Sequence, residues 1–144
     1  MRISVLGMGR MGEGVALRLL EGGHEVTVWN RSPGKGKEAI GHGATEARSV
    51  PEATGGADVV ITSLSNDEAV RGVALGPDGV AGRLDGAVYV DASTISPDLS
   101  AELAQEIEAF VAMPILGNPE AVRSGKALYV LGGPAAVVQR LDLV

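Results

Sequence analysis

Apolar residues along the chain follow two alternating periods, that of strands and that of helices. Short runs rich in Val and Ile, such as residues 59–62 and 87–90, are typical of buried strands. Between these runs, apolar positions recur at helical spacing, as at Val15 and Leu19. A regular alternation of strands and helices favours a parallel sheet.

The predicted strands occupy residues 3–6, 25–29, 59–62, 87–90, 110–112 and 128–131, with a short one following residues 43–45. Helices are predicted after residue 12, over 33–42, after the capping residues Ser49, Asn66 and Ser96, and from Pro134 to Val144. Together they predict one domain, residues 1–144, with a Rossmann-type α/β fold: a doubly wound, mainly parallel sheet with helices on both faces.

One predicted connection is unusually short. The helix that begins at Ser96 extends through Glu108 and meets the strand at Phe110, although a helix-to-strand connection usually takes about two to six residues. Either the connection is shortened, or residues are missing from the sequence near Ala109. The last predicted helix also runs to the end of the chain at Val144.

Composition narrows the class of protein. The net charge of −6 argues against nucleic acid or an anionic membrane as a partner, and no apolar run approaches the ~20 residues of a membrane span. The absence of cysteine excludes disulfides, thiolate metal sites and a cysteine nucleophile, and it fits a cytoplasmic protein. His24 and His42 lie apart without ligand spacing, so we expect no metal site.

A glycine-rich segment, Gly7-Met8-Gly9-Arg10-Met11-Gly12, lies between the first strand and the first helix. This is the arrangement that receives a dinucleotide pyrophosphate, because glycines let the backbone approach the phosphates and the helix N-terminus attracts an anion. The pattern alone is weak, since 21 residues of the chain are glycine. The alternative is a glycine-rich turn that holds no nucleotide.

The second strand ends at Asn30, Arg31 and Ser32, where the fold places its ribose-reading residue, on the order of 20 residues after the glycines. An NAD site would carry a carboxylate there, whereas the Arg31 guanidinium can bind a 2′-phosphate. The sequence therefore predicts NADP rather than NAD, unless Arg31 is only a solvated loop cation.

Hydroxyl and amide side chains follow two further strands. Ser63 and Ser65 come after residues 59–62, and Ser93 and Thr94 come after residues 87–90. Because ligands of open α/β sheets bind at the carboxyl ends of strands, we expect these residues near the nicotinamide ribose and the substrate. For Ser93 and Thr94, turn and capping chemistry is an equal alternative.

Three ordered motifs carry a family resemblance: residues 7–12, residues 30–32 and the D-x-S-T-x-S-P segment at 91–97. They resemble the β-hydroxyacid dehydrogenases, a family that includes 3-hydroxyisobutyrate dehydrogenases, glyoxylate and tartronate semialdehyde reductases, imine reductases and 6-phosphogluconate dehydrogenases. The resemblance implies cofactor contacts from Gly7, Gly9, Arg10, Met11, Gly12, Asn30, Arg31, Ser32, Leu64, Ser65 and Thr94, and substrate contacts from Ser93, Gly117 and Asn118.

The chain departs from the family pattern in two places. Leu116-Gly117-Asn118 replaces the family's S-G-G, which puts a hydroxyacid substrate in doubt and leaves room for an imine or another carbonyl substrate. The family's catalytic lysine and its asparagine partner belong to a helical catalytic and dimerisation domain that follows the nucleotide domain. Nothing in this chain matches them, and we expect Lys126 to be an exposed loop cation.

The resemblance therefore implies the NADP-binding domain of an oxidoreductase that transfers hydride between nicotinamide and a small β-hydroxyacid, semialdehyde or imine. The helical domain, through which the family forms homodimers, is expected to be absent from this chain, so the chain alone should bind NADP(H) with little turnover. The alternative is a non-catalytic NADP-binding sensor or scaffold module.

Overall fold

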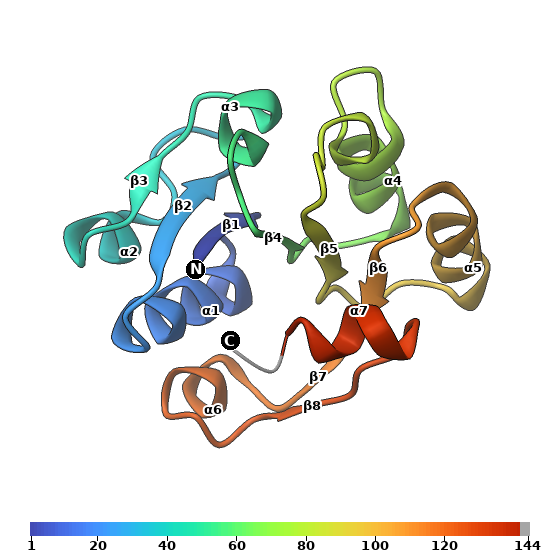
Figure 1. Cartoon of the computed structure of the whole chain (residues 1–144). Coiled ribbons are helices and arrows are strands. Elements are labelled where there is room, and N and C mark those ends of the chain that lie inside the picture. Colours follow the sequence, from blue (N-terminus) through green and yellow to red (C-terminus); the bar gives the residue numbers. More distant parts are fainter. Residues whose placement is uncertain (142–144) are drawn as a thin grey trace.

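A computed structural model describes residues 1–141 and shows a six-stranded parallel sheet (Figure 1). The strand order is β3-β2-β1-β4-β5-β6, which confirms the predicted Rossmann-type fold. The strands are β1 (Arg2–Leu6), β2 (Glu25–Trp29), β3 (Thr45–Glu46), β4 (Val59–Thr62), β5 (Val88–Asp91) and β6 (Phe110–Ala112). Strand order reverses between β1 and β4, and open α/β sheets bind their ligands at the carboxyl ends of the strands at such a point.

Helices cover both faces of the sheet. Alternate side chains of each strand point to opposite faces: Val59 and Ile61 of β4 join the apolar cluster around α1, while Val60 joins the cluster around α4 and α5. Two apolar cores result, one on each face of the sheet. The helices are α1 (Arg10–Glu21), α2 (Lys37–Gly41), α3 (Val50–Thr54), α4 (Asp67–Leu75), α5 (Pro97–Glu106), α6 (Pro119–Arg123) and α7 (Ala135–Gln139), with a 3₁₀ turn η1 (Val80–Gly82).

The predicted capping residues begin their helices as expected. Oxygens of the Ser49, Asn66 and Ser96 side chains accept hydrogen bonds from backbone N–H groups in the first turns of α3, α4 and α5. Such caps are local interactions, and each satisfies a donor that the helix itself leaves free.

Two predicted helix boundaries were wrong. α2 begins only at Lys37, because Gly34 and Gly36 adopt φ angles of +83° and +75° and turn the chain before the helix. α5 ends at Glu106, and Ile107 is already extended and buried. Residues 107–109 thus form a short but complete connection to β6, so the fold requires no missing residues at that point.

The strand predicted at residues 128–131 is shorter and lies outside the main sheet. β8 (Leu128–Tyr129) pairs antiparallel with β7 (Ile115–Leu116), and a bridge between Ala112 and Gly132 ties this ribbon to β6. The predicted helix after Pro134 is present as α7 but ends at Gln139, and the part of the prediction that falls on residues 142–144 lies outside the described part of the chain.

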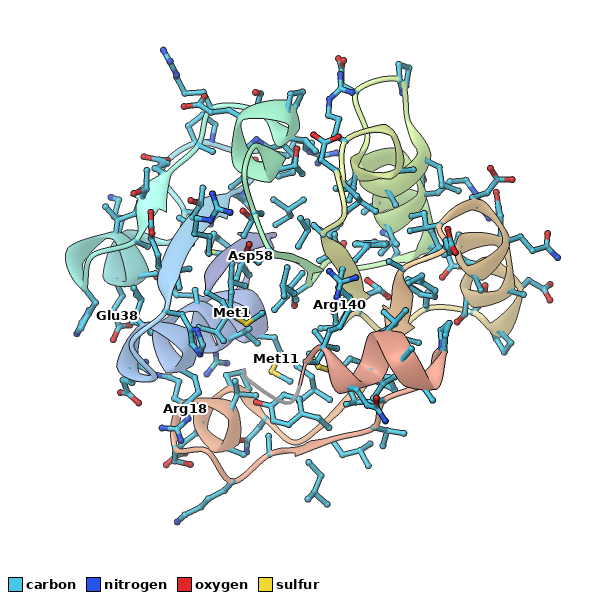
Figure 2. All side chains as sticks on the ribbon, in the orientation of Figure 1. Met1, Met11, Arg18, Glu38, Asp58 and Arg140 are labelled. Carbon is cyan, nitrogen blue, oxygen red and sulfur yellow. The ribbon has the colours of Figure 1, made fainter. Side chains whose placement is uncertain are left out.

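Charged side chains form an ion pair and a hydrogen bond at the amino edge of the sheet. Arg2 pairs with Asp58 at 3.1 Å, and Arg140 donates to the Gly86 carbonyl (Figure 2). Within residues 1–141, no helix combines the length and the apolar character needed to cross a bilayer.

Gly12→Ala should destabilise the fold. A Cβ at Gly12 would lie 1.9 Å from the Gly7 carbonyl oxygen, a backbone atom that cannot rotate away. We expect a loss of about 1–3 kcal/mol or more in the free energy of unfolding, measured by urea denaturation. Gly72→Ala is the matched control, since Gly72 also lies in a helix but nothing lies within 4 Å of its Cβ position. That control should gain about 0.5–1 kcal/mol; equal stabilities of the two variants would contradict the packing argument.

Candidate functional site

The glycine segment lies at the carboxyl edge of the sheet, between β2 and β4. The Gly7 N–H donates to the Trp29 carbonyl at 2.8 Å, and Gly7 has a φ of +105°. A Cβ on Gly7 would lie 2.2 Å from the Ser63 carbonyl oxygen. Only glycine therefore allows the chain to leave β1 this close to the end of β4.

The N-terminus of α1 has the properties of an anion site. Its N-cap is Gly9, which has no side chain to cap the helix, and nothing lies within 4 Å of the position that a Cβ would take there. The first helical hydrogen bond is from the Glu13 N–H to the Gly9 carbonyl. Within residues 1–141, the N–H groups of Arg10, Met11 and Gly12 have no acceptor. Free donors beside an open, glycine-lined backbone fit a pyrophosphate.

Asn30 joins the second strand to the glycine segment. Its Oδ1 accepts from the Met8 N–H at 2.8 Å, and its Nδ2 donates to the Ser32 carbonyl at 3.0 Å. The amide thus holds the turn at Ser32 against the glycine segment. Asn30 is placed to shape the predicted ribose site, while its direct contact with a cofactor stays a prediction.

Two arginines flank this turn and differ from every other arginine in the chain. Arg10 starts α1 and Arg31 follows β2; both are exposed, and within residues 1–141 neither side chain makes a hydrogen bond or an ion pair. All the others donate to a carboxylate or a backbone carbonyl. The two arginines without a protein partner within residues 1–141 therefore both lie beside the glycine segment, where phosphate is expected.

The structure brings the two predicted serine-rich segments together. The Leu64 N–H donates to Ser93 Oγ at 2.8 Å, which joins the segment after β4 to the segment after β5. Ser93 is only 6% exposed, whereas Ser65 and Thr94 are exposed. The hydroxyls open to a ligand at this edge are thus those of Ser65 and Thr94.

Asp91 begins the motif at residues 91–97, but the sequence assigned it no role of its own. It is 1% exposed at the end of β5, and its Oδ1 accepts from Thr62 Oγ1 at 2.7 Å. Burial raises the pKa of Asp91, while hydrogen bonds from Thr62 and Ser93 act in the opposite direction. Burial also raises the pKa of Tyr89, whose hydroxyl bonds to Thr62. The signal in the sequence was an acidic residue that ends an otherwise apolar run.

A second carboxylate, that of Asp67, connects the starts of α4 and α5 at this edge. Asp67, at the start of α4, accepts hydrogen bonds from both the backbone N–H and the side chain of Ser96, the N-cap of α5. The Ser96 side chain, and then its backbone N–H, lower the pKa of the Asp67 carboxyl. Asp67 therefore stays ionised while it holds α4 against α5.

Gly117 and Asn118 lie at the start of α6. Asn118 accepts from the Ala121 N–H as the N-cap of α6, and Gly117 packs between Ala121 and Ala127. α6 in turn packs against α1, with the Pro119 carbonyl 3.4 Å from the Cβ position of Gly14. No contact that we observe joins them to Ser93, so their substrate role stays a prediction. Lys126 is exposed in the loop after α6, as expected.

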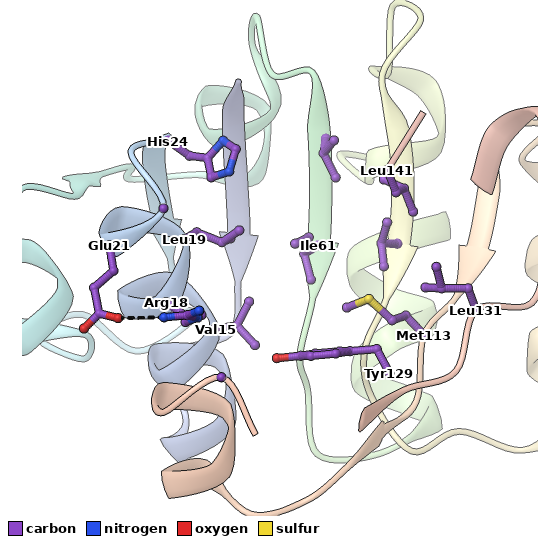
Figure 3. Close-up of a pocket in the computed structure, with 14 residues that line it drawn as sticks. Val15, Arg18, Leu19, Glu21, His24, Ile61, Met113, Tyr129, Leu131 and Leu141 are labelled. Carbon is purple, nitrogen blue, oxygen red and sulfur yellow. Dashed lines mark hydrogen bonds and ion pairs between the residues drawn. The ribbon is translucent and has the colours of Figure 1, made fainter. Parts of the chain in front are cut away.

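An apolar cavity of about 620 Å³ lies on the α1 face of the sheet (Figure 3). Val15, Ile61, Met113 and Tyr129 line it, and the Arg18–Glu21 ion pair lies at its side. None of the residues predicted to contact cofactor or substrate lines this cavity. It is therefore distinct from the polar site at the carboxyl edge.

Comparison with known sequences agrees with this geometry. The family model of the NAD binding domain of 6-phosphogluconate dehydrogenase matches residues 2–144. An uncharacterized oxidoreductase, YfjR of Bacillus subtilis, is 35% identical in an alignment that covers 96% of this chain and 50% of that protein. The cytokine-like nuclear factor N-PAC of Xenopus tropicalis is 36% identical over 96% of this chain and 27% of its own. The chain thus spans at most half the length of these relatives.

Solved structures show the same arrangement. A 3-hydroxyisobutyrate dehydrogenase from Mycobacterium tuberculosis, solved with L-serine, superposes with a TM-score of 0.90 and 30% identity, over 98% of this chain and 49% of that one. Psf3, solved with NADP⁺ and 2-OPP, gives a TM-score of 0.91 and 29% identity, over 98% of this chain and 52% of that one.

Asp67 should make the fold sensitive to acid. Its folded-state pKa is lowered, so its stabilisation is present above the unfolded-state pKa near 3.9 and is lost as the pH falls through the folded-state pKa. In urea denaturation between about pH 6 and about pH 3, Asp67→Asn should lose less stability than the unmodified protein. Glu108→Gln, a change at an exposed residue between α5 and β6, is the control and should follow the unmodified protein. If the free energy of unfolding fell equally with pH in the unmodified protein and in Asp67→Asn, the stabilising role of the Asp67–Ser96 hydrogen bonds would be contradicted.

Proposed function

Because the chain belongs to the family of the NAD binding domain of 6-phosphogluconate dehydrogenase, we propose that it binds NADP(H) at the carboxyl edge of its sheet, as part of an oxidoreductase. One observation carries the choice of NADP: Arg10 and Arg31 lack a protein partner within residues 1–141, and both flank the uncapped start of α1. An NAD site would instead present a carboxylate to the ribose 2′-hydroxyl.

The proposed contacts follow the order of the strands. The backbone at Gly9 and the free N–H groups at the start of α1 hold the pyrophosphate, with Arg10 beside them. Arg31 and Ser32 hold the 2′-phosphate, in a turn that Asn30 fixes. Leu64, Ser65 and Thr94 face the nicotinamide ribose, and the substrate binds next to the nicotinamide, on the far side of Thr94.

The proposed reaction is hydride transfer between the nicotinamide and a small β-hydroxyacid, semialdehyde or imine. The bound nicotinamide supplies or accepts the hydride. The task of this chain is to bind and orient the cofactor, because nothing in its sequence matches the family's catalytic lysine. Residues 1–144 alone should therefore bind NADP(H) with little turnover.

A second candidate is a non-catalytic module that binds NADP(H) as a sensor or scaffold. It is favoured by the N-PAC relative, whose name is that of a nuclear factor and which is as similar in sequence as the oxidoreductase relative. The two candidates differ in turnover. The full-length product of the gene that encodes this chain, supplied with NADPH and a panel of small semialdehydes and imines, should consume the reduced nicotinamide if the first candidate is right. Tight NADPH binding without consumption would favour the module.

Arg31→Ala should weaken NADPH selectively. Loss of a hydrogen-bonded charge pair costs about 1.5–3 kcal/mol, so the Kd for NADPH should rise at least about tenfold while the Kd for NADH stays the same. Isothermal titration calorimetry measures both. Arg48→Ala is the matched control: Arg48 is exposed and pairs only with Glu52 on α3. An equal loss of NADPH and NADH affinity, or no loss of either, would overturn the NADP assignment.

A further inference from the structure

Glu13 of α1 makes two hydrogen bonds to a neighbouring helix. Its Oε1 accepts from the Glu38 N–H at 3.0 Å and from the Ala39 N–H at 3.3 Å. Glu38 and Ala39 are the second and third residues of α2, and their N–H groups are the ones that the side chain of an N-cap residue normally receives. Glu13 therefore caps α2 from a different helix.

The N-cap residue of α2 cannot supply this acceptor itself. It is Gly36, which has no side chain, and the position that a Cβ would take there lies 2.9 Å from Met8 Cγ. A serine or an aspartate at this position would press against Met8, and it would also have to adopt the φ of +75° found there. Because α2 has only five residues, its order depends on contacts from outside the helix. Glu13 provides such a contact.

The loop over residues 31–35 joins Asn30 to this capped helix and contains Arg31. All five of its residues are exposed. At the start of the loop, Asn30 accepts a hydrogen bond from the Met8 N–H. At its end, the buried Gly36 packs on the Met8 side chain and leads into α2. Both ends of the loop are thus attached to the glycine segment, and the order of its far end depends on the start of α2.

A second contact of α2 comes from an ion pair. Glu38 pairs with Arg123 at the end of α6. Both side chains are about half exposed, and such a pair contributes little to stability. The ion pair involves only the Glu38 side chain, whereas Glu13 binds the backbone of the first turn, directly after the loop. Glu13 is therefore the contact that fixes the backbone at the far end of the loop.

A carboxylate in the first turn of a helix can also have a local role, because it interacts favourably with the helix dipole. Glu13 lies in the first turn of α1, but its Oε1 receives two donors from α2, and the residue is half-buried. A negative charge close to an expected pyrophosphate would by itself repel the ligand. The carboxylate is better explained by the acceptor that it provides to α2.

We propose that Glu13 is a positioning residue for the 2′-phosphate of NADP(H). By capping α2 it fixes the far end of the loop over residues 31–35, so that Arg31 stays beside the glycine segment. Glu13 acts on the cofactor only through this loop. The inference rests on the proposed function, because it assigns a task within that site.

Isothermal titration calorimetry of two Glu13 variants with NADPH and NADH tests this role. Glu13→Ala removes the acceptor, so the Kd for NADPH should rise about fivefold, as for the loss of one helix cap, with the Kd for NADH unchanged. Glu13→Gln keeps a side-chain oxygen as acceptor and should bind NADPH within about twofold of the unmodified protein. If the carboxylate only repelled the phosphates, both variants would instead bind NADPH more tightly.

Two control variants separate the cap from other effects. Glu21→Ala makes the same change at the other end of α1, where Glu21 forms an exposed ion pair, and it should alter neither Kd. Glu38→Ala removes the ion pair to Arg123 but keeps the backbone N–H that Glu13 receives. Its Kd for NADPH should therefore stay within about twofold of that of the unmodified protein.

A double variant shows whether Glu13 acts through Arg31. If it does, Glu13→Ala should have no further effect once the guanidinium is gone. The Kd of Glu13→Ala/Arg31→Ala for NADPH should then equal that of Arg31→Ala alone.

The cap can also be measured without a ligand. Amide hydrogen exchange followed by NMR should be about fivefold faster at Glu38 and Ala39 in Glu13→Ala than in the unmodified protein, because their acceptor is lost. Exchange at both amides should be unchanged in Glu21→Ala. Unchanged exchange in Glu13→Ala would overturn the cap.

The possible failures are distinguishable. If the unmodified protein does not bind NADPH, the proposed function fails and the positioning role fails with it, whereas amide exchange still reports on the cap. If it binds NADPH and Arg31→Ala weakens that binding selectively, three results would each overturn the positioning role alone. These are an unchanged or lower Kd for NADPH in Glu13→Ala, an equal rise of the Kd for NADH, and additive losses in the double variant. Should Glu13→Ala not fold, Glu13→Met, which keeps the length of the side chain without the acceptor, decides by the same comparison.

Discussion

The close approach of Gly7, Gly12 and Ser63 is the constraint on which the rest of the site depends. A side chain at Gly7 would meet the Ser63 carbonyl, and one at Gly12 would meet the carbonyl of Gly7 itself. Without either side chain, the start of α1 lies close to the carboxyl ends of β1 and β4, at the point where strand order reverses. The helix therefore presents its free N–H groups to the crevice where α/β sheets bind ligands.

The two edges of the sheet differ in whether their arginines have partners within the protein. At the amino edge, Arg2 pairs with Asp58 and Arg140 with a backbone carbonyl. At the carboxyl edge, Arg10 and Arg31 have no partner within residues 1–141, while Asp67 and Asp91 are occupied by hydroxyl and N–H donors. Two positive charges without a protein partner thus lie beside the glycine segment, in a chain whose net charge is negative. A local field of this sign attracts a phosphate-rich ligand against the overall charge.

Local features of the fold were predictable from the sequence, whereas long-range pairings were not. The caps at Ser49, Asn66 and Ser96 depend on residues within one turn, so the sequence contains the whole interaction. The β7–β8 ribbon depends on pairing across the helix α6, and periodicity in two-residue strands cannot reveal it. For the site, the glycine segment and Arg31 were recognised by type and spacing. The buried hydrogen bond of Asp91 was missed because its partner Thr62 comes from a neighbouring strand, and only the sheet register brings the two together.

The central claim is that a dinucleotide lies across the carboxyl edge, from Arg31 over the glycine segment to Thr94. An NMR titration of the isotope-labelled chain with NADPH tests it residue by residue. The account predicts that backbone amide signals of Gly9, Met11, Arg31 and Thr94 shift together with one Kd, while those of Tyr129 and Leu131, which line the apolar cavity, stay in place. Shifts confined to the cavity, or none at the glycine segment, would contradict the account.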